Sequence, residues 1–159
     1  ETSYEDSFNI FIPKETKDFK SLTNVIYDNG FRKKNSDVFD STIKLFFYYL
    51  EKYKKKNYFT NVCRFRANLL LKDGSYPKDF HSIPHIDNKF ADGLLYYVND
   101  SDGDTLVWNE TPDDDKMTLR GRVSPKKGRL LIFDSSKLHT STPPMINDSR
   151  VAINFVFRR

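Results

Sequence analysis

The spacing of the apolar residues changes near residue 61, and this change constrains the fold more than any other feature of the sequence. Before it, apolar residues recur every three or four positions. After it they alternate, in short runs separated by Gly, Pro, Asn and Asp. The first spacing is typical of amphipathic helices and the second of half-buried strands. The sequence therefore predicts a helical support region over residues 1–60 and a β-barrel core over residues 61–159.

Two helices are expected in the first region. One is predicted between Thr16, a suitable N-cap, and Gly30, a residue type that commonly follows a helix. The other covers residues 43–50, follows Asp40 and Ser41, and is itself followed by lysines, whose charge complements the C-terminal end of a helix dipole.

The second region contains short apolar runs bounded by turn residues, which indicate strands. The expected strands cover residues 63–71, 93–99, 105–108, 129–134 and 151–157, with weaker candidates at 82–86 and 120–123. Antiparallel strands that follow two helices are typical of a sandwich or barrel with helices covering one sheet.

The strands at 63–71 and 151–157 each have one apolar and one partly polar face, because alternate residues of a strand share a face. The apolar sets are Cys63, Phe65, Ala67 and Leu69, and Val151, Ile153, Phe155 and Phe157. The polar sets are Arg64, Arg66, Asn68 and Leu70, and Arg150, Ala152, Asn154 and Val156. We expect the apolar faces to lie under the helices and the polar faces to line a wet cavity.

Length and composition fit one globular domain. The 159 residues include one cysteine, Cys63, which excludes an internal disulfide framework and a cysteine-rich zinc site. No run approaches the roughly 18 apolar residues of a membrane helix, and no signal-like leader opens the chain. The sequence therefore predicts a soluble protein of a reducing cytoplasm, with no membrane partner.

The net charge of +4 is only a weak indication of nucleic-acid binding. Many of the cations gather at residues 32–34 and 52–56, beside a helical pattern, where a solvated surface is the simpler interpretation. The sequence therefore disfavours nucleic acid as a partner and leaves the oligomeric state open.

Two of the three histidines fit a metal site. His85 and Asp87 are two positions apart, so in an extended chain the imidazole and the carboxylate project to the same side. His139 would complete a set of two histidines and one carboxylate, which holds one face of Fe(II) and leaves the other face open. His81 lies between two prolines, and we interpret it as a partly exposed loop residue.

Arg150 begins the last strand on its polar face, where an unpaired guanidinium inside a barrel would be costly. A dicarboxylic cosubstrate that chelates iron at one end would supply the missing carboxylate. Further motifs stand at Pro84-His85-Ile86-Asp87, Leu95-Tyr96-Tyr97-Val98-Asn99, Asp102-Gly103-Asp104-Thr105, residues 125–130 and residues 139–150. In this order they resemble the Fe(II)- and 2-oxoglutarate-dependent oxygenases, particularly the prolyl hydroxylase branch, from about Arg64 to Phe157.

This resemblance implies a double-stranded β-helix, a cupin-like jelly-roll barrel, within a single domain over residues 1–159. It implies Fe(II) as the metal, 2-oxoglutarate as the cosubstrate and O2 as the oxidant. His85, Asp87 and His139 would be the iron ligands. Arg150 would pair with the distal carboxylate of 2-oxoglutarate, and Tyr97 would place its phenol on the same carboxylate.

Strand facing alone adds three candidates for the cofactor pocket, namely Arg66, Asn68 and Asn154.

Two positions narrow the chemistry within the family that the motifs resemble. Val156 stands where the branch that repairs alkylated bases carries a further arginine, which disfavours base repair. Asp87 stands where halogenating members have a small residue, which disfavours halogenation.

Asp104 replaces the second of two glycines that usually precede the threonine, a change that removes no ligand.

The function expected from this resemblance is hydroxylation of an unactivated C–H bond, with peptidyl proline as the first substrate. A free amino acid or another small metabolite is the alternative substrate. From a different class, the chain could be an inert metal-binding β-barrel that serves as a recognition module. Arg150 disfavours the inert module, since a protein with no cosubstrate has little use for an inward guanidinium.

Overall fold

The computed structural model describes residues 21–28, 31–32, 38–52, 62–77, 79–114 and 116–158. Its elements follow in the order β1 (Ser21–Asp28), β2 (Phe31–Arg32), α1 (Val38–Lys52), β3 (Val62–Leu71), β4 (Ala91–Tyr97), β5 (Thr105–Trp108), β6 (Leu119–Val123), β7 (Leu130–Asp134), β8 (His139–Ser141) and β9 (Ser149–Arg158). The described part of the chain is thus mainly β with one helix. The first residues of the helix expected after Thr16 lie outside it.

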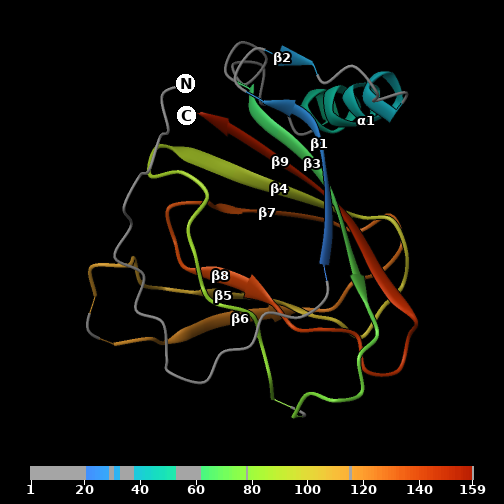
Figure 1. Ribbon diagram of the computed structural model, residues 1–159. Helices are drawn as coiled ribbons and strands as arrows, with labels where there is room; N and C mark the ends of the chain where they lie inside the picture. Colours follow the sequence, from blue (N-terminus) through green and yellow to red (C-terminus); the bar gives the residue numbers. More distant parts are fainter. Residues whose placement is uncertain are drawn as a thin grey trace, which may run out of the picture.

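The strands form two antiparallel sheets (Figure 1). The larger has the order β2-β1-β3-β9-β4-β7 and the smaller the order β6-β5-β8. Helix α1 lies on the side of the large sheet opposite the small sheet. No named strand joins the two sheets by hydrogen bonds within the described residues, so a closed barrel is not observed there.

The apolar core lies between α1 and the large sheet. The ring of Phe46 packs 5.5 Å from that of Phe65, 5.0 Å from Phe155 and 5.7 Å from Phe157, measured between centroids. All four side chains are almost fully buried. Paired residues of an antiparallel sheet share a face, and Phe65 pairs with Phe155. The prediction that the apolar faces of β3 and β9 lie under a helix is therefore confirmed.

The helix expected between Thr16 and Gly30 is wrong for its described part, which is the strand β1. β1 pairs with β3 along its length, from Ser21 opposite Leu70 to Asp28 opposite Arg64. Of the apolar residues at helical spacing, Leu22 is 63% exposed and only Ile26 is buried, so they form no common buried face. The β-branched residues between them favour a strand once β3 offers its edge.

The other expected elements agree more closely with the structure. α1 contains the second expected helix, and the five main strands appear within a few residues of their expected bounds. The weaker candidate at 120–123 is β6. The one at 82–86 is a single bridge at His85 rather than a full strand, and β8 was not expected. No described helix has the length and apolar character needed to cross a membrane.

Candidate metal centre

Main-chain pairing brings the two expected histidine ligands together. His85 N–H donates to the carbonyl of His139 at 3.0 Å, and His139 N–H donates to the carbonyl of His85 at 2.9 Å. The Asp87 N–H is held by the carbonyl of Ser135, just after β7. Ligand atoms of His85, Asp87 and His139 all lie within 4.8 Å of one another.

Each imidazole is oriented by a carbonyl two residues before it. Nδ1 of His85 lies 3.1 Å from the oxygen of Ile83, and Nδ1 of His139 lies 2.9 Å from the oxygen of Lys137. A carbonyl only accepts, so each Nδ1 carries a hydrogen, and Nε2 is the ring atom of each histidine that could bind a metal. Desolvation, and then the neighbouring His139, lower the pKa of His85, which favours the neutral form that binds metals.

The carboxylate of Asp87 is held from three sides. Oδ1 pairs with the guanidinium of Arg64, while Oδ2 accepts a hydrogen bond of 3.1 Å from Asn154 Nδ2 and lies 3.4 Å from His139 Nε2. Burial by itself would raise the pKa of Asp87. The contacts with His139, Arg64 and Asn154 outweigh burial and hold the pKa well below its usual range. Asp87 is therefore a fixed anion beside the two Nε2 atoms.

This donor set fits Fe(II). Two imidazole nitrogens and one carboxylate oxygen lie close together, which is the ligand set of non-haem Fe(II) oxygenases. His139 is buried while His85 is exposed, so solutes could reach the open side of a metal held there.

A second polar cluster surrounds Arg150, which is 4% exposed. Its Nη2 donates to Thr105 Oγ1 at 2.8 Å, and the hydroxyl of Tyr97 donates to the same oxygen at 2.7 Å. The guanidinium carbon lies 5.5 Å from the centroid of the Tyr97 ring. Within the described residues, Arg150 Nε has no hydrogen-bond partner and the guanidinium forms no ion pair.

Burial changes the acidity of both groups in this cluster. Desolvation lowers the pKa of Arg150 and raises the pKa of Tyr97. A buried cation with an unused donor is costly unless an anion joins it. The cluster therefore fits a carboxylate, such as the distal one of 2-oxoglutarate. Thr105 was not among the expected site residues, although the motif at residues 102–105 pointed to it.

Gly103 lets the chain approach Arg150 closely. A Cβ at this position would lie 2.9 Å from the carbonyl oxygen of Thr142 and 3.1 Å from Cδ of Arg150. These distances leave no room for a side chain unless the backbone or Arg150 moves. Asp104, the departure from the double glycine, forms an ion pair of 3.4 Å with Arg122.

The candidates chosen by strand facing lie on the same face of the large sheet as this site. Asn154 contacts Asp87, Arg66 pairs across the sheet with Asn154, and Asn68 accepts a hydrogen bond from Thr23. Arg64 was missed as a site residue. Its position, two residues before Arg66 on the polar face, was the available signal.

The remaining histidine and the tryptophan have structural surroundings. His81 lies in a loop, half-buried, with its ring 5.6 Å from that of Trp108. Trp108 is buried with Leu106 and Leu138. The prediction of a partly exposed loop histidine is confirmed.

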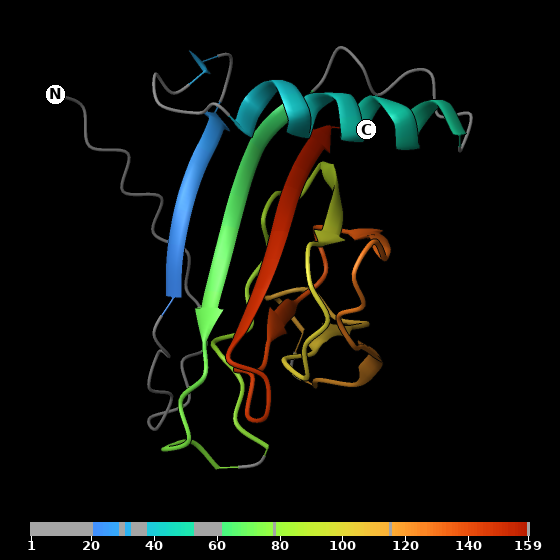
Figure 2. The same cartoon turned by 90° about the vertical axis from the view of Figure 1, so that its right-hand side faces the viewer.

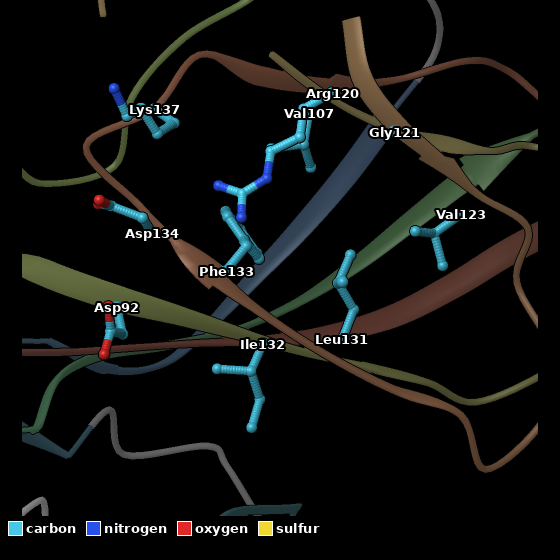
Figure 3. A pocket seen from close by; sticks show the side chains of 10 residues that line it. All are labelled: Asp92, Val107, Arg120, Gly121, Val123, Leu131, Ile132, Phe133, Asp134 and Lys137. Atoms are coloured by element: carbon cyan, nitrogen blue, oxygen red, sulfur yellow. The ribbon is translucent and has the colours of Figure 1, made fainter. Parts of the chain in front are cut away.

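A cleft of about 430 Å³ adjoins the candidate metal centre between β6 and β7 (Figure 3). It is lined by Asp92, Val107, Arg120, Gly121, Val123, Leu131, Ile132, Phe133, Asp134 and Lys137. Phe133 belongs to the cleft and also packs edge-on against His139, with ring centroids 4.7 Å apart. In Figure 3 the side chain of Arg120 extends from β6 toward Phe133.

Comparison with known proteins identifies relatives of this arrangement. A family model described as the 2OG-Fe(II) oxygenase superfamily matches residues 74–158, more than half of the chain. No curated protein matches the sequence.

Three solved structures have a similar fold. An oxidoreductase of the 2OG-Fe(II) oxygenase family from Burkholderia pseudomallei superposes with a TM-score of 0.61 at 14% identity, covering 87% of this chain and 66% of that one. A prolyl hydroxylase from Trichoplax adhaerens, in complex with a peptide fragment of the hypoxia inducible factor oxygen degradation domain, gives 0.57 at 19%, covering 88% and 63%. A Pseudomonas putida prolyl-4-hydroxylase gives 0.51 at 17%, covering 87% and 69%. The chain thus spans about two thirds of the length of these structures.

Proposed function

The chain belongs to the 2OG-Fe(II) oxygenase superfamily, and we propose that it is a hydroxylase whose iron ligands are His85, Asp87 and His139. Membership of the superfamily implies Fe(II), 2-oxoglutarate and O2. When bound, these three supply the oxidising power that converts a C–H bond into C–OH. The convergence of two Nε2 atoms and one carboxylate is the observation that carries the proposal.

The chain's own residues would bind and orient the cosubstrate. We assign the distal carboxylate of 2-oxoglutarate to Arg150, with Tyr97 and Thr105 beside it. The buried guanidinium with an unused Nε supports this role. The Thr105 hydroxyl accepts from both neighbours, so its own proton is available to the carboxylate. Asn154 would keep Asp87 turned toward the metal.

For the architecture, we propose that residues 1–159 form one oxygenase domain with a double-stranded β-helix core. Two antiparallel sheets with the candidate metal centre between them support this arrangement. The segment that ends at His85 pairs with β8 and so extends the small sheet by one chain.

Peptidyl proline is the first substrate we propose. The prolyl hydroxylase from Trichoplax adhaerens binds a peptide fragment, and its similar fold supports a peptide here by analogy only. A free amino acid or another small metabolite is the alternative, and an inert metal-binding recognition module is the non-enzymatic one. The single cysteine and the metabolite cosubstrate favour a reducing cytoplasm.

The test is aerobic incubation of the Fe(II)-loaded protein with 2-oxoglutarate, with succinate as the measured product. Slow succinate formation without substrate is expected, and His139→Ala should abolish it. Binding of 2-oxoglutarate by calorimetry is measured in parallel on the Zn(II)-loaded protein. If the protein shows neither turnover nor cosubstrate binding, this result favours the inert module and rejects the hydroxylase.

A further inference from the structure

Three arginines lie on the face of the large sheet that looks toward the candidate metal centre. The carboxylate of that centre, Asp87, contacts this face through Arg64 and Asn154. Arg64 and Arg66 are alternate residues of β3, and Arg66 pairs with Asn154 of β9. Arg150 lies on the same face, four residues before Asn154 along β9. The three guanidinium charges exceed the single negative charge of Asp87. Adding the 2-oxoglutarate dianion and Fe(II) leaves this excess unchanged, because their charges cancel.

Arg64 pairs with Asp87, and Arg150 is assigned to the distal carboxylate of 2-oxoglutarate. Arg66 has no such anion. Its Nε is buried without a hydrogen-bond partner, and it forms no ion pair within the described residues. Desolvation and the charge of Arg64 lower the pKa of Arg66, and the opposing influence of Asp87 and Asp28 is smaller. A half-buried cation in this condition is stabilised when an anion arrives.

Arg66 lies on β3, one strand nearer to β1 than Asn154 and Arg150, which both lie on β9. It is opposite Asn154, which holds Asp87, whereas Arg150 contacts Thr105 of the small sheet. Figure 2 shows the small sheet on the side of β9, with β1 at the opposite edge of β3. A cosubstrate that runs from Arg150 to the metal would therefore leave Arg66 facing the β1 side.

We propose that Arg66 binds a carboxylate of the substrate, so that the enzyme acts on compounds with an anionic group close to the hydroxylated carbon. The assignment rests on the proposed function and specifies its substrate class. The carboxylate could come from a free amino acid or from an acidic residue next to the target in a peptide. A guanidinium recognises both through the same paired hydrogen bonds.

The test compares binding of matched acids and amides by the Co(II)-loaded protein with 2-oxoglutarate, in the absence of air. One pair is L-proline and L-prolinamide, and the other is acetyl-Pro-Glu-amide and acetyl-Pro-Gln-amide. The change in the visible spectrum of Co(II) reports binding. Wild type is compared with Arg66→Gln, with Arg66→Lys, and with Arg158→Gln, which removes an exposed arginine at the end of β9.

Wild type and Arg158→Gln should prefer the acid of at least one pair by about 10- to 100-fold, the range expected for a charged hydrogen bond. Arg66→Gln should lose this preference, Arg66→Lys should keep part of it, and 2-oxoglutarate affinity should change less than about threefold.

Equal binding of acid and amide by wild type, or binding of neither, would overturn the assignment, as would an unchanged preference in Arg66→Gln. If Arg66→Gln also lost 2-oxoglutarate binding, Arg66 would bind the cosubstrate rather than the substrate, and the assignment would be wrong. Succinate formation by wild type separates these results from failure of the proposed function, because it requires the metal and the cosubstrate but no substrate.

Discussion

His85 and His139, 54 positions apart in sequence, exchange two main-chain hydrogen bonds, so the backbone itself sets the separation of the two imidazoles. The ring centroids lie 4.7 Å apart. Because each Nδ1 is also held by a carbonyl, the site is ordered by main-chain contacts before any metal binds. A preorganised site of this kind loses little conformational entropy on binding.

Replacing His85 by Ala should weaken Co(II) or Fe(II) binding by at least about 100-fold, the upper end of the cost of losing an outer-sphere partner. The exposed position of His85 predicts little change in the free energy of unfolding. His81→Ala is the matched control, since His81 packs on Trp108. Equal metal affinity of His85→Ala and His81→Ala in a calorimetric titration would remove His85 from the ligand set.

Arg150→Met should abolish 2-oxoglutarate binding and leave the protein as stable as wild type or more stable. The reason is that a buried guanidinium without an anion costs free energy that an apolar side chain of similar length avoids. Calorimetry measures 2-oxoglutarate binding, and urea unfolding in the absence of cosubstrate measures the free energy of unfolding. A variant that is strongly destabilised yet still binds the cosubstrate would contradict this role.

Gly103→Ala should reduce 2-oxoglutarate affinity, because a Cβ there would press on the Thr142 carbonyl and on Cδ of Arg150. The cost in unfolding free energy should be about 1–3 kcal/mol, as for other overpacked sites. Gly74→Ala is the control, since no atom lies within 4 Å of its added Cβ. Calorimetry on both variants decides whether the effect is specific to Gly103.

Asp102 should make stability depend on acid pH. Its carboxylate accepts hydrogen bonds from the N–H groups of Met145, Ile146 and Asn147, and these bonds outweigh desolvation and lower its pKa. The stabilisation is present above the unfolded value of about 3.9 and disappears as the pH falls through the lower folded value.

Between about pH 5 and pH 2, the wild type should therefore lose more stability than Asp102→Asn. Urea unfolding at several pH values measures the difference. Asp148→Asn changes an exposed carboxylate of the same loop and should follow the wild type. Parallel curves for wild type and Asp102→Asn would show that Asp102 has no such effect.

Phe46→Ala should destabilise the fold by about 3–5 kcal/mol, the usual cost of removing a buried aromatic ring. Phe46 of α1 is fully buried and packs on both Phe65 and Phe155. Phe47→Ala, on the exposed side of the same helix, should cost much less. Equal losses in urea unfolding would mean that α1 does not cover the large sheet as described.

The sequence alone determined the features that depend on local spacing. Alternation along residues 63–71 and 151–157 predicted which side of β3 and β9 is apolar, because successive side chains of any strand point to opposite faces. The two-residue spacing of His85 and Asp87 gave them a common direction for the same reason. The roles expected for His139, Arg150 and Tyr97 came from the resemblance of the ordered motifs to the Fe(II)- and 2-oxoglutarate-dependent oxygenases.

Tertiary structure alone decided which elements became neighbours. The segment 21–28 has helical spacing, yet it is a strand because the edge of β3 accepts it along its whole length. The contact of Arg64 with Asp87, and the Thr105 hydroxyl shared by Tyr97 and Arg150, depend on the register between distant strands. Register arises from packing across the whole sheet, so no local pattern contains it.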